Sequence, residues 1–387
     1  MRRSEEPPRP GGQRPERGDD RPDGLFLVLA SRGGFEKFTG PIPARHEPCF
    51  RFAKPNETTR IETILPDCRL VISTSYLPPP THRWIFEARR RGIPTLLLVD
   101  GPLEWSNVYR SPSLRRRMGP GQAGLFEPII HDAVAGIGAA QIRWIGDRNE
   151  GRGIELMAYS NHRIQHRIGT RPGPIGNPER DEEFDFLITT ARKPYFDDAE
   201  RQALTRCLLD ACDALSAGGH RYALRVFDRP LLRSLRRRRP ELRVETEGSF
   251  ASALARTSCV IGTPSSVLLE AMQHGKPTGT LIFRDTPLFY QTGWLLGGTS
   301  DWRASLESML RREPERMEFQ ARVLRENLSD EDFFAHCDRI RDGESLARAR
   351  PIDAADLEFE NRSLRRLLGW RARLLLPLLR RLYPRTD

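Results

Sequence analysis

Long apolar runs and paired cysteines are the two features that this sequence lacks. No apolar run approaches the ~20 residues that a membrane-spanning helix needs, and the polar, proline-rich start has none of the marks of a secretory signal. The six cysteines include no C-x-x-C pair. We therefore expect reduced thiols in a cytoplasmic protein.

The length and the charge bound the organisation of the chain. A chain of 387 residues is too long for one small core and suits two domains. The formal net charge is +10, and much of the excess lies in the two ends. Residues 1–24 contain no aromatic residue and cannot bury enough apolar surface to offset the entropy of ordering, so we predict a disordered tail.

Residues 25–168 are predicted to form a first α/β domain. Arg32-Gly33-Gly34 is predicted to be a turn that admits a ligand close to the backbone, although the spacing of a dinucleotide fingerprint is missing. A Gly- and Pro-rich linker is expected at 169–180. The expected elements are strands Leu25–Ser31, Leu70–Ser75, Thr95–Asp100, Val134–Gly138 and Ile154–Tyr159, with a helix over Thr81–Arg91.

Residues 181–342 are predicted to form a second α/β domain, organised around the strand–helix–strand unit Ser258–Phe283. Such units imply parallel sheets. Within this unit, Thr263 is the expected N-cap of the helix and Pro264 its first residue. The other expected strands are Phe184–Thr190, Tyr222–Phe227 and Leu242–Glu247; the other expected helices are Asp197–Ser216, Pro230–Arg238, Ser249–Arg256, Asp301–Arg312, Pro314–Asn327 and Asp330–Ile340.

The C-terminal end has a composition of its own. After a second linker at 343–360, residues 361–387 place leucines along one helical face and arginines mostly on the opposite face. This pattern fits a helix that lies on an anionic membrane surface. A helix docked on the protein itself or on a second subunit is the alternative.

The turn Thr263-Pro264-Ser265-Ser266 is the strongest candidate for a ligand site. It combines hydroxyl groups, free backbone N–H groups and the positive end of a helix dipole, at the sheet edge where ligands of parallel α/β proteins bind. These are the groups that bind a phosphate. An ordinary capped helix explains the same residues, and spacing alone does not separate the two interpretations.

Three motifs resemble the two-domain GT-B glycosyltransferases, and more narrowly the bacterial transferases of capsule and lipopolysaccharide synthesis. Ser265-Ser266 before Glu270–Pro277 matches a Ser-Ser motif followed by E-A-M-x-x-G-K-P, Asp100-Gly101 matches part of an acid-acid-Gly turn, and Gly176-Asn177-Pro178 matches a linker. The chain is similar in this respect to bacterial sialyltransferase-like and CDP-glycerol glycerophosphotransferase-like proteins. The resemblance covers residues 25–342 and implies two Rossmann-like domains that face each other across a cleft.

One departure from that pattern concerns the donor phosphate. The resembled families carry a His-Pro pair after the strand that here is Tyr222–Phe227, but this chain has Phe227-Asp228-Arg229-Pro230. Arg225 matches an arginine that often precedes the pair. Three consequences stay open: neighbouring arginines hold the phosphate, the donor differs, or activity is lost.

The resemblance and the chemistry of sugar transfer assign the candidate site residues. Asp100 is the expected base, with Glu104 as a weaker substitute and a turn cap as the alternative role of Asp100. Glu270 would accept hydrogen bonds from ribose. We expect no cofactor and no essential metal, because the proposed site holds no D-x-D pair of the kind that binds a metal–diphosphate. The expected donor-binding residues are Arg192, Lys193, Arg225, Thr263, Ser265, Ser266 and Glu270.

The leading hypothesis is therefore an inverting, metal-independent glycosyltransferase at the cytoplasmic face of the cell membrane. It would move a sugar from a nucleotide-sugar donor to a cell-surface polysaccharide or lipid-linked acceptor, with 361–387 on the anionic membrane surface. A CDP-glycerol-type glycerophosphotransferase and a non-catalytic scaffold of polysaccharide assembly are the alternatives. No nucleic-acid partner is expected, because the run Arg236–Arg239 has no interleaved aromatic residues.

Overall fold

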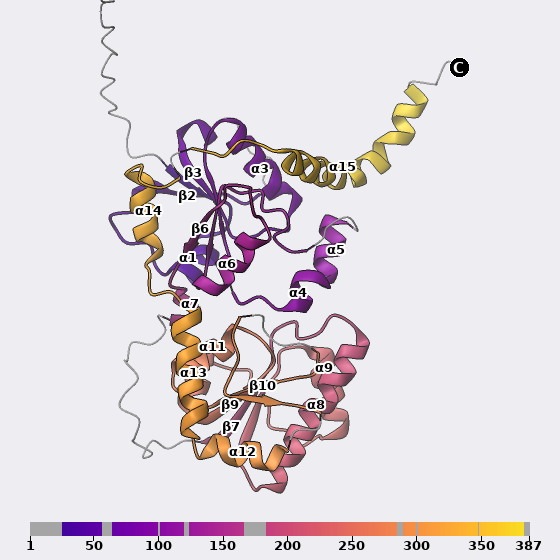
Figure 1. Ribbon diagram of the computed structural model, residues 1–387. Helices are drawn as coiled ribbons and strands as arrows, with labels where there is room; N and C mark the ends of the chain where they lie inside the picture. The colour runs from indigo at the N-terminus through magenta and orange to yellow at the C-terminus, as the bar shows by residue number, and fades with distance from the viewer. Residues whose placement is uncertain are drawn as a thin grey trace, which may run out of the picture.

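The computed structural model describes residues 25–55, 64–99, 101–119, 124–165, 183–284, 289–298, 301–346 and 348–382. The predicted tail at 1–24, the linker at 169–180 and the proposed base Asp100 lie outside these ranges. Two parallel sheets, one above the other in Figure 1, organise the described chain.

The first sheet has six parallel strands in the order β2-β1-β3-β4-β5-β6. Helices cover both of its faces, so its strands are apolar on both sides, as the burial of all four residues of Thr95–Leu98 illustrates. Its strands are β1 (Leu25–Val28), β2 (Phe50–Phe52), β3 (Cys68–Ser73), β4 (Thr95–Leu98), β5 (Ala133–Gly136) and β6 (Glu155–Ala158). The intervening helices are α1 (Arg32–Thr39), α3 (Pro79–Arg90), α4 (Trp105–Tyr109), α5 (Pro112–Met118), α6 (Ala139–Asp147) and α7 (His162–Gln165), with 3-10 turns at Glu47–Cys49 and Leu65–Asp67.

The second sheet has five parallel strands in the order β11-β10-β9-β7-β8. The βαβ unit forms its centre, because β9 pairs with both β7 and β10. Its strands are β7 (Phe184–Thr189), β8 (Tyr222–Arg225), β9 (Thr257–Gly262), β10 (Thr278–Leu281) and β11 (Trp294–Leu296). The helices are α8 (Asp198–Ala217), α9 (Arg229–Arg238), α10 (Phe250–Ala255), α11 (Ser266–Gln273), α12 (Trp302–Leu310) and α13 (Pro314–Asn327).

After α13 the chain returns to the first sheet, which the sequence did not reveal. Helix α14 (Phe333–Arg341) lies within the expected second domain, 181–342, yet its Phe333 and Phe334 pack in a core with Phe35 and Phe50 of the first. By packing, the second unit therefore ends at α13. Figure 1 shows α14 alongside the first sheet.

The C-terminal helix α15 (Ala354–Leu382) begins inside the stretch expected to be a linker. Its first turns pack on α3 of the first domain, where Phe359 is buried and Ser363 bonds the ring of His82 at 2.8 Å. Beyond these turns it leaves the body of the protein (Figure 1). In the described part of the chain, no helix is long and apolar enough to cross a membrane.

Two local predictions are wrong. Leu242–Glu247 is not a strand, and only Val244 forms a bridge, to Leu224, because Arg243 and Glu245 instead form surface ion pairs. Arg32–Gly34 is not an open turn but the first turn of α1, where the Ser31 hydroxyl accepts from the Gly34 N–H.

Candidate functional site

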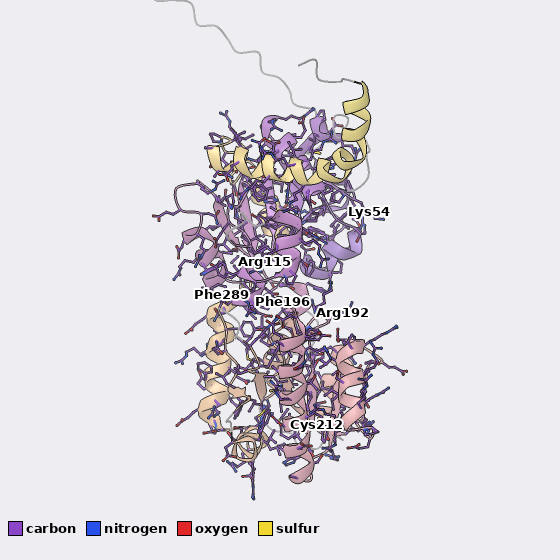
Figure 2. All side chains as sticks on the ribbon, turned by 90° about the vertical axis from the view of Figure 1, so that its right-hand side faces the viewer. Lys54, Arg115, Arg192, Phe196, Cys212 and Phe289 are labelled. Atoms are coloured by element: carbon purple, nitrogen blue, oxygen red, sulfur yellow. The ribbon has the colours of Figure 1, made fainter. Side chains whose placement is uncertain are left out.

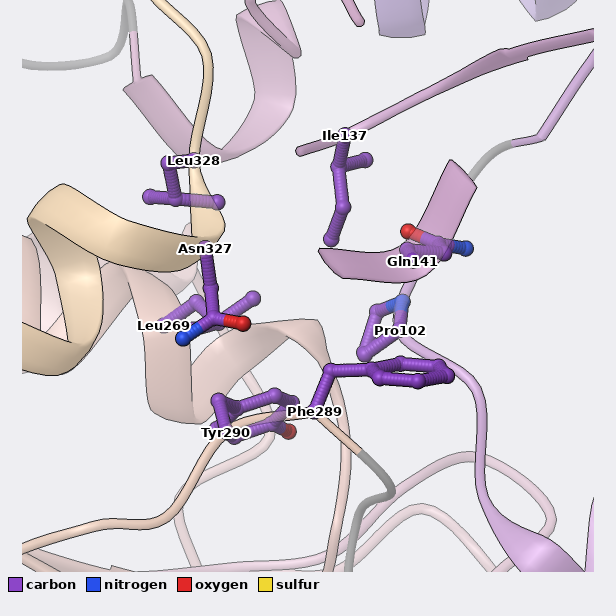
Figure 3. Close-up of a pocket in the computed structure, with 8 residues that line it drawn as sticks. All are labelled: Pro102, Ile137, Gln141, Leu269, Phe289, Tyr290, Asn327 and Leu328. Carbon is purple, nitrogen blue, oxygen red and sulfur yellow. The ribbon is translucent and has the colours of Figure 1, made fainter. Parts of the chain in front are cut away.

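The carboxyl edges of the two sheets meet at the boundary between the domains. Residues that follow β4 and β5 of the first sheet contact residues that follow β9 and β10 of the second, around a cavity of about 10 Å³ (Figure 3). This volume holds about one water molecule. The lining residues are Pro102, Ile137, Gln141, Leu269, Phe289, Tyr290, Asn327 and Leu328.

Backbone atoms of the two domains also touch directly. The Ser329 N–H donates to the Ile137 carbonyl at 3.0 Å, next to Gly138. A Cβ built on Gly138 would lie 1.7 Å from the Asn327 carbonyl oxygen, although the extended backbone of Gly138 suits any residue. The missing side chain therefore permits the close approach of α13 to the β5–α6 turn.

Gly138→Ala is expected to lower the stability of the protein by about 1–3 kcal/mol, since an added methyl group must push the two domains apart. Thermal unfolding and the radius of gyration in solution measure this. Gly33→Ala is the control, because its Cβ meets nothing within 4 Å. Equal melting temperatures of both variants would contradict the contact.

A buried ion-pair cluster bridges the same boundary. The Arg284 guanidinium, after β10, bonds Glu104 of the first domain at 2.6 Å and Glu200 of the second at 3.1 Å. The Phe196 ring lies 4.6 Å from the guanidinium carbon. Glu104, the suggested substitute base, is therefore engaged in holding the two domains together.

The turn after β9 is built differently from the prediction. Ser265, not Thr263, is the N-cap of α11, and the helix begins at Ser266. Thr263 instead ties β9 to β7: its hydroxyl accepts from the Ala191 N–H at 2.8 Å, and its own N–H donates to the Thr189 carbonyl. Because Pro264 precedes the cap, it is not a helical residue.

Two buried hydroxyls at this edge lack hydrogen-bond partners among the described residues. Ser265 Oγ makes no capping bond, and Thr190 Oγ1, on a residue that is 4% exposed, is also unpartnered. Buried polar groups are nearly always satisfied by protein, water or ligand. Together with the first N–H groups of α11, which point away from the helix, these hydroxyls suit a bound anion.

Cationic and aromatic side chains extend this edge along the neighbouring strands. Arg192 and Lys193, after β7, are exposed, and Phe227, after β8, is 40% exposed. The Arg192 guanidinium carbon lies 6.0 Å from the centre of the Phe227 ring. Figure 2 shows Arg192 and Phe196 at the end of the second domain that faces the first.

Arg225 reaches the same edge, but its guanidinium is already occupied. It is buried and donates to the carbonyls of Glu245, Glu247 and Gly248, at 3.3, 3.0 and 2.7 Å. Burial lowers its pKa. In this arrangement Arg225 holds the loop before α10, and its remaining contact toward the site is the face of Phe227, at 5.2 Å.

Glu270 and the neighbours of Asp100 lie at the boundary itself. Glu270 is buried in α11, and its carboxylate is 3.6 Å from Arg163 of α7. Asp100 is not described, but the carbonyl of Val99 accepts from the Tyr159 hydroxyl at 3.0 Å, and that of Gly101 from the Gln141 amide at 2.9 Å. The chain on either side of Asp100 is therefore held at the edge that faces α11.

The described residues contain no group of three or more His, Cys, Asp or Glu arranged to hold a metal ion. The D-x-D spacing that does occur, at 330–332, lies before α14. There Asp332 caps the helix, and Glu331 pairs with Arg339 and lies 3.6 Å from the ring of His336. These acids are used in local structure.

Sequence reasoning found the turn and the basic residues but missed three members of this site. Thr190 and Phe227 are the last residues of two predicted strands, so their position at the edge of the sheet could be predicted from the sequence. Arg284 pairs with a residue 180 positions away, and no local signal marks that contact.

These features define the class of protein. Two parallel sheets covered by helices, with facing carboxyl edges and a last pair of helices that returns to the first sheet, form a two-domain α/β protein of the GT-B type. The predicted fold class of two Rossmann-like domains is confirmed.

Comparison with known proteins adds solved structures of low similarity. No protein-family model and no curated protein matches the chain. It is similar to UDP-GlcNAc 2-epimerase of Methanocaldococcus jannaschii, solved with UDP-GlcNAc and UDP, with a TM-score of 0.49, 12% identity, and coverage of 78% of this chain and 98% of that one. It is also similar to HepE of Anabaena, solved with UDP and glucose, with a TM-score of 0.46, 13% identity, and coverage of 83% of this chain and 91% of that one.

TarM of S. aureus, solved with UDP among its ligands, matches with a TM-score of 0.45 and 11% identity over 70% of this chain. The chain spans about half of that protein, 55% of its length. With TM-scores this low, the likenesses carry no information about substrate or reaction.

Proposed function

We propose that the protein is a glycosyltransferase that takes a sugar from a nucleotide-sugar donor and attaches it to a glycan or lipid-linked acceptor at the cytoplasmic membrane face. A GT-B-type fold by itself does not decide function. The observation that supports the proposal is the edge around Ser265 and Thr190, where two buried hydroxyls lack hydrogen-bond partners beside the start of α11. Such groups suit a diphosphate.

The order of the strands supports one orientation of the donor. Strands β9, β7 and β8 lie side by side in that order, with about 4.8 Å between adjacent strands. The groups that follow these three strands therefore form a row along the edge of the sheet. A diphosphate bound at the start of α11 would lie beside the positive charges of Arg192 and Lys193. The nucleobase would then reach Phe227, whose exposed face offers a stacking surface.

The acceptor side comes from the first domain. Asp100 takes the proton from an acceptor hydroxyl as that oxygen forms a bond to the anomeric carbon of the sugar. The bond from that carbon to the diphosphate oxygen breaks, and the nucleoside diphosphate leaves. A single displacement of this kind inverts the anomeric configuration. The α11 N–H groups and the neighbouring arginine stabilise the leaving charge, a role that needs no metal ion.

Nucleotide binding tests the proposal with two kinds of variant. Ser265→Ala combined with Ser266→Ala should lower the affinity for a nucleoside diphosphate and for inorganic pyrophosphate alike, by roughly 10-fold. Each lost hydroxyl removes a hydrogen bond that contributes about 0.5–1.5 kcal/mol to binding. Phe227→Leu should lower the affinity for the nucleotide about 5-fold or more and leave the affinity for pyrophosphate unchanged, because only the nucleobase stacks on the ring.

Thermal shifts against UDP-, GDP-, CMP- and CDP-linked donors first select the nucleotide, and calorimetry then gives the affinities. Ser216→Ala is the control, since Ser216 lies at the opposite edge of the same sheet, where it bonds Tyr222. Stabilisation by CDP-glycerol alone would favour a glycerophosphotransferase. Stabilisation by no donor would contradict the transferase and favour a scaffold.

A further inference from the structure

Two arginine-bearing helices meet on the first domain. Helix α15 crosses α5 after packing on α3, and the Arg366 guanidinium donates to the Arg116 carbonyl at 3.4 Å. Figure 1 shows α15 passing above α5, and Figure 2, which looks onto that side, labels Arg115 of α5 below α15, toward the second domain. The two segments are thus parts of one surface, although about 250 residues separate them.

This surface carries positive charge without acidic partners. Arg115, Arg116, Arg117, Arg365 and Arg366 are all exposed, and none forms an ion pair within the described ranges. By contrast, the nearby Arg90 and Arg91 are paired with Glu360 and Glu87. The five arginines therefore present an uncompensated positive charge to whatever approaches this end of the protein.

The same helix continues away from the protein with an apolar composition. It remains helical to Leu382, and six of the nine residues at 374–382, LLLPLLRRL, are leucine. Leu368, Leu375, Leu378, Leu379 and Leu382 share one face by helical spacing. An apolar face next to unpaired arginines calls for a partner that is both apolar and anionic.

We propose that α15 beyond Leu367 and the arginines of α5 form one docking surface for a bilayer that contains anionic lipid. The inference rests on the membrane location in the proposed function but not on the transfer reaction. A second copy of the chain fits less well, because a two-fold contact would bring the arginine cluster against itself. A nucleic acid offers no counterpart for the leucines.

Sedimentation of the full-length protein with vesicles tests this surface. Vesicles of 70% phosphatidylcholine and 30% phosphatidylglycerol should pellet the protein, pure phosphatidylcholine should do so weakly, and added salt should reduce the effect. Arg115→Ser, Arg116→Ser and Arg117→Ser together should lower the partition coefficient roughly 100-fold, about five-fold for each arginine. Leu375→Glu with Leu379→Glu should abolish pelleting.

The matched control is Arg233→Ser, Arg236→Ser and Arg237→Ser on α9, which removes the same charge from exposed residues of the second domain. Its binding should stay within about twofold of the parent, and all variants should share the melting temperature of the parent. An equal loss in this control would show unspecific attraction and overturn the proposal. Absence of pelleting, with a dimer that Leu375→Glu and Leu379→Glu dissociate, would assign the surface to a second copy.

Discussion

Asp100→Asn should reduce the rate of sugar transfer by about 100-fold or more while leaving donor affinity unchanged, since a general base contributes roughly that factor to the transition state. The amide keeps the size of the side chain but cannot accept the proton of the acceptor hydroxyl. The rate is measured as release of nucleotide from the donor that stabilises the protein, with water or glycan as acceptor.

Asp147→Asn is the matched control, an exposed aspartate at the end of α6 in the same domain, and it should keep the parent rate. A rate of Asp100→Asn close to that of the parent would remove this residue from the mechanism. A loss of donor affinity instead of rate would make Asp100 a binding residue. Either result leaves the diphosphate site at α11 standing.

Asp356→Ala should lower the free energy of unfolding by about 3–5 kcal/mol, the cost of leaving buried charges without their partner. Asp356 is fully buried at the start of α15 and contacts Arg89 at 2.9 Å, Arg152 at 2.6 Å and Arg350 at 2.9 Å. Its removal takes the one carboxylate that all three guanidinium groups share. Arg89 then keeps only Asp132, at 3.2 Å, and the other two arginines keep only Asp353, at 3.0 and 3.4 Å. The first turn of α15 also loses its anchor on the first domain.

Urea unfolding followed by circular dichroism measures this loss. Glu358→Ala, two residues away, is the control, because that side chain is 73% exposed and lies 4.0 Å from Arg362. Its effect should stay within about 0.5 kcal/mol, as for most surface substitutions. A loss below about 1 kcal/mol in Asp356→Ala would mean that the network does not hold α15 in place.

Local patterns predicted the elements of the fold with useful accuracy. Helix α13 occupies the predicted range Pro314–Asn327, and the strand–helix–strand unit around α11 forms the centre of its sheet. These successes follow from apolar periodicity and from proline and glycine at helix ends, which act within a few residues. Leu242–Glu247 failed because alternation of this kind also arises from ion pairs on a surface.

The candidate site divides in the same way. The polar turn at Ser265 could be predicted because a β-strand, a polar turn and a helix follow one another in the chain. The hydrogen bonds of Arg225 to three backbone carbonyls could not be predicted, because they depend on where the loop Glu245–Gly248 lies. The cap at Ser265 instead of Thr263 likewise depends on the bond that Thr263 accepts from the N–H of Ala191, in the loop after β7.

The sequence alone determined two parallel α/β units, a polar turn at the edge of the second, and a leucine- and arginine-rich C-terminal segment, since each of these follows from neighbours in the chain. Only the tertiary structure decided that α14 packs on the first sheet, that Arg284 joins Glu104 to Glu200, and that α15 crosses α5. The physical reason is distance along the chain: shape, burial and charge pair these groups once the fold is formed, and no local preference encodes their meeting.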